Sequence, residues 1–198
     1  MARLSYTAIA SLDGYIEDAA GSFDWAMPDE EVHRFANELD RTVGRHLLGR
    51  RMYETMVFWE DPDNVAGGPD YVLEYGRTWR EADKVVFSRS LESVSSERTT
   101  IERDFDPELI RRWKSEMSTA QPDADLSIGG AELAGLALRA GLVDDVHLLL
   151  VPILVGGGKR ALPDGITQEL DLVDMRRFAS GFVHLAYRTR DKGDAASG

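Results

Sequence analysis

Short apolar runs alternate along the chain with segments whose apolar side chains recur at helical spacing. The apolar runs predict strands at residues 4–10, 46–48, 84–88, 99–102, 125–130, 146–155 and 182–190. The helical spacing predicts helices at residues 28–44, 53–57, 72–79, 107–117 and 131–140. Because strands and helices alternate in this way, the pattern favours an α/β domain with a largely buried sheet.

Two stretches show neither pattern. Residues 60–70 are rich in Pro, Gly, Asp and Asn, which predicts a loop and suggests a mobile lid. Residues 191–198 contain no large apolar side chain, so we expect a disordered tail there. No internal repeat or linker interrupts the remainder, which predicts a single domain over residues 1–190.

Composition excludes several classes of protein. The chain has 198 residues, a formal net charge of −12 and no cysteine. Without cysteine there is no disulfide scaffold, cysteine nucleophile, iron–sulfur cluster or common zinc knuckle. The acidic balance argues against a nucleic-acid partner, because neutralising phosphates requires clustered Lys and Arg.

Membrane and metal signals are also missing from the sequence. The longest apolar stretch, residues 146–155, is about half of the ~20 residues that a membrane helix requires. The first ten residues lack the long apolar core of a signal peptide. The four histidines are scattered, without metal-binding spacing. We therefore expect a cytoplasmic protein with no metal site and no membrane partner.

Glycines follow three of the predicted strands, and these positions are candidates for binding an anionic ligand. They are Gly49-Arg50-Arg51, Gly129-Gly130 and Gly156-Gly157-Gly158. In α/β sheets ligands bind at the carboxyl ends of strands, and free N–H groups at a helix start attract phosphate. The alternative is that these are ordinary turn glycines. Neither the Gly-x-Gly-x-x-Gly fingerprint nor the P-loop motif occurs, so a Rossmann domain and a P-loop are not expected.

Five motifs occur in the order found in a known superfamily. They are Ser11-Leu-Asp-Gly-Tyr15, Leu48-Gly-Arg-Arg-Met-Tyr-Glu54, Phe87-Ser-Arg-Ser-Leu91, Ile128-Gly-Gly-Ala-Glu-Leu133 and Pro152-Ile-Leu-Val-Gly-Gly-Gly158. Over residues 3–190 the chain resembles the dihydrofolate-reductase-like superfamily. It is most similar to the reductase domain of the bifunctional riboflavin-biosynthesis deaminase/reductase. No zinc-deaminase half accompanies it in this sequence.

The resemblance implies a dihydrofolate-reductase-like three-layer αβα fold with a mixed, mostly parallel central sheet. It also implies NADPH along the carboxyl edge of the sheet, with a flat heterocyclic substrate on its nicotinamide. Arg50 and Arg51, together with Ser88 and Arg89, are then expected to hold the 2′-phosphate and adenine side by charge-assisted hydrogen bonds. The alternative for each arginine is a solvated side chain.

The same resemblance assigns the glycine-bearing turns. Gly129, Gly130 and Ala131 are expected to meet the pyrophosphate at a helix N-terminus, and Gly49 lies in the turn before Arg50. The turn at Gly156 and Gly157 either closes over the nicotinamide ribose or substrate, or only reverses the chain.

The sequence departs from the family at residue 52. Members commonly carry a threonine after the basic pair, whereas here the residue is Met52. A hydroxyl that can bond phosphate is therefore lost, and backbone N–H groups must serve in its place.

Two carboxylates are candidate catalytic residues. Asp13 lies in the turn after the first strand, where the matching Asp-Gly pair of riboflavin-type reductases meets the substrate; the alternative is a plain turn pair. Glu30 follows Pro28-Asp29 in a stretch that resembles the acid-bearing segment of dihydrofolate reductases. Acidic residues are favoured in a first helical turn by the dipole alone, which is the alternative for Glu30.

The expected function is that of an NADPH-dependent reductase of a pteridine- or aminopyrimidine-type substrate. The alternative is a non-catalytic nucleotide- or small-ligand-binding protein that retains the fold. We further expect a homodimer, to which the strand at residues 146–155 contributes.

Overall fold

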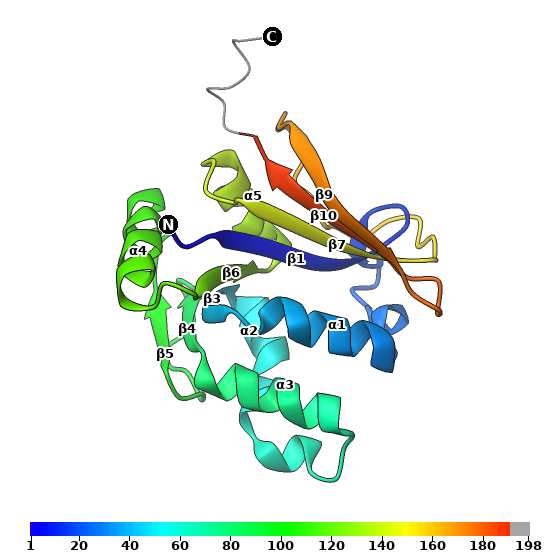
Figure 1. The fold of residues 1–198 in the computed structure, drawn as a ribbon, viewed down its shortest axis with the longest axis horizontal. Helices are drawn as coiled ribbons and strands as arrows, with labels where there is room; N and C mark the ends of the chain where they lie inside the picture. The colour runs from blue at the N-terminus through cyan, green and yellow to red at the C-terminus, as the bar shows by residue number, and fades with distance from the viewer. Residues whose placement is uncertain (191–198) are drawn as a thin grey trace.

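A computed structural model describes residues 1–190 and contains one eight-stranded sheet (Figure 1). The strand order is β5-β4-β3-β6-β1-β7-β10-β9. Five neighbouring pairs from β5 to β7 are parallel, and the two pairs that involve β10 are antiparallel. The mixed, mostly parallel sheet predicted above is therefore confirmed. The predicted tail at 191–198 lies outside the described residues.

All strands of the large sheet except β9 match the apolar runs. Those of the large sheet are β1 (Leu4–Ser11), β3 (Val43–Gly49), β4 (Asp83–Phe87), β5 (Thr99–Glu102), β6 (Asp125–Gly129), β7 (Asp145–Val151), β9 (Leu170–Arg177) and β10 (Val183–Thr189). A separate two-stranded sheet pairs β2 (Tyr15–Glu17) with β8 (Lys159–Arg160).

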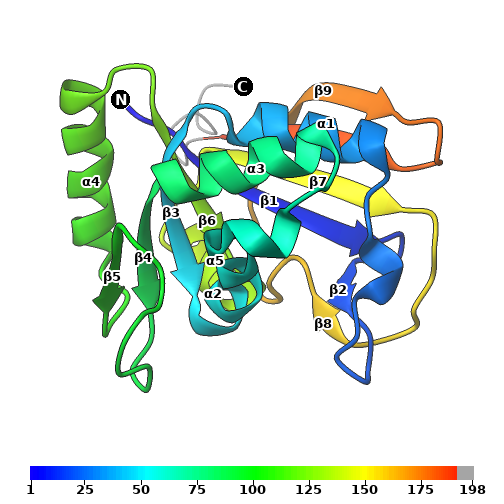
Figure 2. The ribbon, with the colours of Figure 1, turned by 90° about the horizontal axis from the view of Figure 1, so that it is seen from below.

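Helices cover both faces of the large sheet (Figures 1 and 2). The α-helices are α1 (Glu30–Asp40), α2 (Arg50–Met56), α3 (Asp70–Glu81), α4 (Pro107–Ala120) and α5 (Ala131–Arg139). Short 3₁₀ turns are η1 (Asp24–Ala26), η2 (Val57–Glu60) and η3 (Pro62–Val65). The Asp29 and Asp106 carboxylates cap α1 and α4, each accepting a backbone N–H of the first turn.

Neighbouring residues in a strand belong to different cores, because successive side chains point to opposite faces. Leu47 and Val85 pack in a cluster with residues of α4 and α5, whereas Leu48 and Val86 pack with α2 and α3. A third cluster joins Phe35 of α1 to buried residues of β7. The three-layer αβα arrangement follows from this division.

Some predicted boundaries were wrong. The predicted helix at 28–44 ends at Asp40, because Val43 is buried in β3 and pairs with Asp125 of β6. The predicted strand at 146–155 ends at Val151, because Pro152 has no N–H with which to continue a ladder. Strand β9 was not predicted, because aspartates interrupt its apolar residues and nearly all of its side chains are exposed at the sheet edge.

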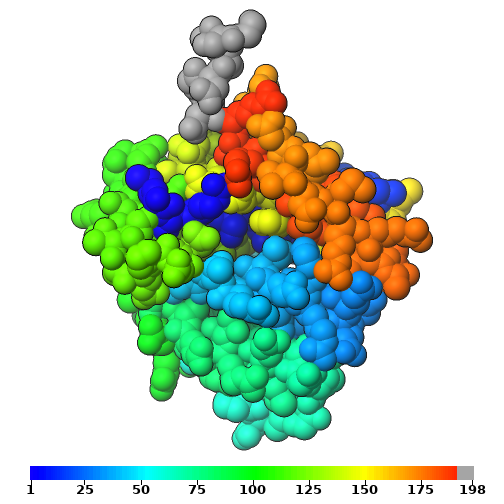
Figure 3. Space-filling view, in the orientation of Figure 1, coloured from blue at the N-terminus to red at the C-terminus, as the bar shows by residue number. Residues whose placement is uncertain are grey.

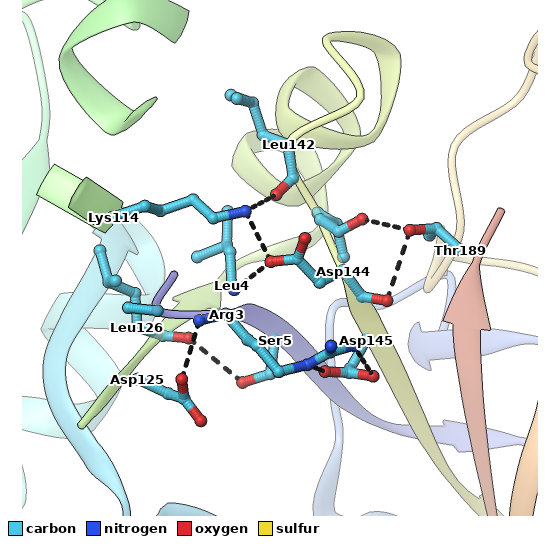
Figure 4. Close-up of polar contacts among 12 residues, drawn as sticks. Arg3, Leu4, Ser5, Lys114, Asp125, Leu126, Leu142, Asp144, Asp145 and Thr189 are labelled. Atoms are coloured by element: carbon cyan, nitrogen blue, oxygen red, sulfur yellow. Dashed lines mark hydrogen bonds and ion pairs between the residues drawn. The ribbon is translucent and has the colours of Figure 1, made fainter. Parts of the chain in front are cut away.

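A polar network fixes the amino ends of β1 and β7 (Figure 4). The Lys114 Nζ donates to Asp144 at 2.6 Å, and the same carboxylate oxygen accepts the Leu4 N–H at 2.6 Å. The Arg3 guanidinium pairs with Asp145. These carboxylates hold the sheet at the end opposite the strand termini that carry the glycines.

A histidine pair, buried at His184 and half-buried at His147, joins β7 to β10. The His147 and His184 rings are stacked, with Nδ1 of His147 3.0 Å from Nε2 of His184. His184 is only 1% exposed. Burial, with a smaller contribution from the charge on His147, lowers the pKa of His184 to about 4.

We predict that this pair makes the protein sensitive to acid. The unfolded chain binds a proton at His184 near its ordinary pKa of 6.5, whereas the folded chain resists protonation until about pH 4. The free energy of unfolding should therefore fall by about 2–3 kcal/mol as the pH drops through this window. Urea titrations at pH 7 and pH 4.5 measure the change. In His184→Gln the pH-dependent loss should be smaller, and an identical loss would contradict the assignment.

Candidate active site

The chain leaves β3 and β6 toward opposite faces of the sheet, although these strands are neighbours. The helix after β3 is α2, whose Met52 packs in the cluster with α3. The helix after β6 is α5, whose Leu133 packs in the cluster with α4. Such a divergence leaves a crevice at the carboxyl ends of the two strands, the usual ligand site of open α/β sheets.

Gly130 sits in this crevice with a backbone that favours glycine. Its φ is +94°, and it precedes the first residue of α5 without a side-chain cap. A Cβ on Gly130 would lie 3.5 Å from Cβ of Met52 and 3.7 Å from the Gly49 nitrogen. The first amides of α5 therefore face a space that a side chain would narrow, at the positive end of the helix dipole.

A cavity of about 610 Å³ opens at these strand ends. Its walls come from the residues that follow β3, β4, β5 and β6, which are consecutive in the sheet, together with α5 and β8. The lining residues are Gly49, Arg50, Arg51, Met52, Phe87, Ser88, Arg89, Arg103, Asp104, Phe105, Gly130, Ala131, Glu132, Leu133, Leu136 and Lys159.

The cavity is basic although the protein is acidic. Five basic and two acidic side chains line it, which gives a formal charge of +3 in a chain of net charge −12. Low-dielectric walls strengthen such a local field. The cavity is therefore suited to an anionic ligand.

The arginines of the cavity are held differently. Arg50 lies 3.4 Å from the Ser90 Oγ and 3.7 Å from the Glu54 carboxylate, and it is exposed. Arg51 is also exposed and makes no ion pair within residues 1–190. Arg103 instead donates through Nη1 to the carbonyl oxygens of Ser88 and Leu91, so it fixes the loop after β4.

Two ion pairs cross the rim of the cavity. Arg89 binds Asp104 at 2.6 Å, and Lys159 binds Glu132 at 2.6 Å. The hydrogen bond and charge of Lys159, with a smaller contribution from Arg51, lower the pKa of Glu132. Glu132 is thus an ionised residue of the first turn of α5.

Seven of the ten predicted cofactor-binding residues line this cavity: Gly49, Arg50, Arg51, Ser88, Arg89, Gly130 and Ala131. Gly129 lies beneath the cavity. A Cβ added to it would lie 3.0 Å from the Leu48 side chain and 3.1 Å from the Met52 side chain. The Ser88 Oγ accepts the N–H of Leu91 at 3.0 Å and so shapes the loop.

The turn at Gly156 and Gly157 does not line the cavity. Instead the Asp13 carboxylate accepts the N–H of Gly156 at 2.8 Å and of Val155 at 3.2 Å. The Ser11 hydroxyl, followed by these two amides, lowers the pKa of Asp13. Asp13 therefore anchors this turn, and its predicted catalytic role stays a prediction.

Glu30 begins α1 at the molecular surface. Its carboxylate accepts the Arg34 Nε at 2.9 Å, and Arg34 also binds Asp70 of α3. The predicted loop at 60–70 contains η3 and does not line the cavity either. The catalytic role of Glu30 and the lid both stay predictions.

Sequence reasoning missed part of the cavity wall. Arg103, Asp104 and Phe105 follow β5, so the general rule that ligands bind at the carboxyl ends of strands would have selected them, although no glycine marks them. The contribution of Lys159 had no comparable signal, since it depends on the pairing of β8 with β2.

Within residues 1–190, no group of three or more His, Asp or Glu is placed to hold a metal ion. No helix in this part of the chain is long and apolar enough to cross a membrane.

Several solved structures share this fold. A putative riboflavin biosynthesis protein from Shewanella sp. PV-4 matches with a TM-score of 0.71 and 18% identity, over 96% of this chain and 100% of that one. A pyrimidine reductase-like protein from Corynebacterium diphtheriae matches with a TM-score of 0.67 and 16% identity, over 96% and 93%. A deaminase/5-amino-6-(5-phosphoribosylamino)uracil reductase from Thermotoga maritima matches over 96% of this chain but 57% of its own, with a TM-score of 0.62 and 14% identity.

Sequence comparison agrees with this likeness. The chain is 29% identical over 190 residues to the uncharacterized protein YyaP of Bacillus subtilis (strain 168), covering 93% of this chain and 94% of that protein. The family model described as the RibD C-terminal domain matches residues 2–184. The expected resemblance to the reductase half of the bifunctional riboflavin protein is thereby confirmed, and the chain belongs to the RibD C-terminal domain family.

Proposed function

We propose that this protein is an NADPH-dependent reductase of a pteridine- or aminopyrimidine-type heterocycle. The observation that carries the proposal is the cavity of formal charge +3 at the open N-terminus of α5, in a member of this family. Fixed positive charge and free backbone amides together bind phosphate groups.

The residues fit a dinucleotide phosphate. The absence of a side chain at Gly130 leaves the first amides of α5 open to a pyrophosphate. Arg50 and Arg51 extend into solvent at the same crevice, where their planar guanidinium groups suit a 2′-phosphate. The bound NADPH would supply a hydride to the substrate.

The protein's part in the reaction is to orient the nicotinamide and the substrate and to exclude water from them. Asp13 is kept ionised by its hydrogen bonds, so it suits the orientation of substrate hydroxyls better than the donation of a proton at neutral pH. The Gly156 amide, which donates to Asp13, lies in the turn before β8, so this contact ties substrate positioning to that turn.

The proposal predicts arginine-dependent NADPH binding. In calorimetric titrations NADPH should bind more tightly than NADH. Arg51→Ala or Arg50→Ala should lower the affinity for NADPH by about 10- to 150-fold, as expected for loss of one charge-assisted hydrogen bond. Arg77→Ala removes the same charge from the exposed side of α3 and serves as the control. Absence of binding of either nucleotide would refute the proposal.

Met52 favours one alternative, a protein that binds a nucleotide but does not turn it over. Its side chain packs against Gly129 and Gly130 where a phosphate-binding hydroxyl was expected. Oxidation of NADPH with any dihydropterin or aminouracil substrate would exclude this alternative.

The expected homodimer remains a proposal. Strand β7 is paired on both sides, by β1 and β10, so any contribution of this strand to a dimer is not by strand addition. The edge strand β9, whose segment is coloured orange in Figure 3, instead exposes three apolar side chains. They are Leu172, Val173 and Met175.

A further inference from the structure

An acidic side chain lies beside a cation assigned to the 2′-phosphate side of the cavity. The Nε and Nη2 of Arg89 both donate to Oδ1 of Asp104, at 3.0 and 2.6 Å. Arg89 follows β4 and Asp104 follows the neighbouring strand β5. The pair therefore spans two adjacent strand ends on the cavity wall.

The other basic side chains near this pair have different partners. Arg103 is held by the carbonyl oxygens of Ser88 and Leu91. Arg50 and Arg51 follow the next strand, β3, and both are exposed. Arg50 lies 3.7 Å from the Glu54 carboxylate, and Arg51 makes no ion pair within the described residues. Asp104 thus cancels one positive charge on this wall and leaves the arginine pair to bind a phosphate.

We infer that Asp104 is a specificity-determining residue that weakens recognition of the 2′-phosphate. Its negative charge repels that phosphate and holds Arg89 away from it, while Oδ2 is left to accept a ribose hydroxyl. A carboxylate beside the adenine ribose has this effect in other dinucleotide sites, where it favours the 2′-hydroxyl. The inference rests on the proposed function, because it places the adenosine end of a dinucleotide in this cavity.

The pair can be altered without disturbing the fold. The Arg89 and Asp104 side chains are 84% and 69% exposed. An exposed ion pair of this kind contributes little to stability. A change in ligand affinity after substitution of Asp104 therefore reports on the cavity, and thermal melts confirm that the variant is folded.

The test uses two probes that differ by one phosphate. Adenosine 2′,5′-bisphosphate and 5′-AMP are titrated by calorimetry into wild type and Asp104→Asn at low salt, where screening is weak. We expect the variant to bind the bisphosphate about tenfold more tightly, because one repulsive charge is removed and one arginine is released. Binding of 5′-AMP should not become tighter, because its 2′-hydroxyl loses a charged acceptor. Asp123→Asn, which removes the same charge from the exposed segment after α4, should change neither.

Arg89→Ala in both backgrounds separates release of the arginine from a general charge effect. It should weaken bisphosphate binding in both backgrounds, because one positive charge is lost. The loss should be larger in Asp104→Asn, where a released guanidinium contact is lost as well, so that the two substitutions are not additive. Equal gains for both probes, or no gain, would overturn the inference while arginine-dependent NADPH binding still supports the proposed function. If no nucleotide binds any variant, both are overturned.

Discussion

Replacing Gly158 with alanine is expected to lower the free energy of unfolding by about 2–5 kcal/mol, from overpacking and from a left-handed backbone. Gly158 has a φ of +129°. A Cβ there would lie 2.6 Å from the carbonyl carbon of Asp18 and 2.8 Å from its Cα, and closer still to the Glu17 carbonyl oxygen. Backbone atoms cannot move aside as a flexible side chain does, so β8 must separate from β2.

The adjacent glycine supplies a matched control. A Cβ on Gly157 would meet nothing within 4 Å, and its φ is not in the left-handed region. Urea denaturation should therefore find Gly157→Ala close to wild type and Gly158→Ala strongly destabilised. Equal stability of the two variants would show that β2 and β8 are not packed as described.

Lys84→Met is expected to lower the free energy of unfolding by about 2–4 kcal/mol, because it leaves a carboxylate without its cation. The Lys84 side chain is fully buried, 3.8 Å from Oε2 of Glu60, and its Nζ donates to the Trp79 carbonyl at 2.9 Å. Glu60 is 16% exposed and also accepts the Trp79 Nε1–H. The loss should therefore be somewhat smaller than for a fully buried pair.

A double-mutant cycle with Glu60→Gln measures the coupling in urea denaturation. If the charges interact, Lys84→Met should cost at least about 1 kcal/mol less once Glu60 is neutral. Additive losses would instead assign the effect of Lys84→Met to its lost contacts with Trp79. These are the hydrogen bond to the Trp79 carbonyl and the ammonium that lies 5.0 Å from the centroid of the Trp79 ring.

Elements that bury a regular apolar pattern were predictable from the sequence. Leu4–Ser11 alternates between two covered faces, and α4 presents Ile110 and Met117 at helical spacing, so local periodicity reports on tertiary burial. Strand β9 was not predictable for the opposite reason. Backbone hydrogen bonds hold it to β10, while its side chains stay in solvent and need no apolar pattern.

The candidate site was predictable where one local rule applies. Glycines and arginines after apolar strands marked Gly49, Arg51 and Gly130, and the fold brings these strand ends together. The role of Asp13 was not predictable, because its partners at residues 155–156 are about 140 positions away in the sequence. The pairing of Arg89 with Asp104 likewise depends on β4 and β5 being neighbours.

The exposed edge strand β9 bears on how the protein behaves at high concentration. A strand with one free edge and apolar side chains at Leu172, Val173 and Met175 is a template for aggregation. Charged residues interrupt that apolar run at Asp171 and Asp174 and end it at Arg176-Arg177. These charges oppose indiscriminate strand addition, so β9 is a poor template for fibrils despite its exposed apolar side chains.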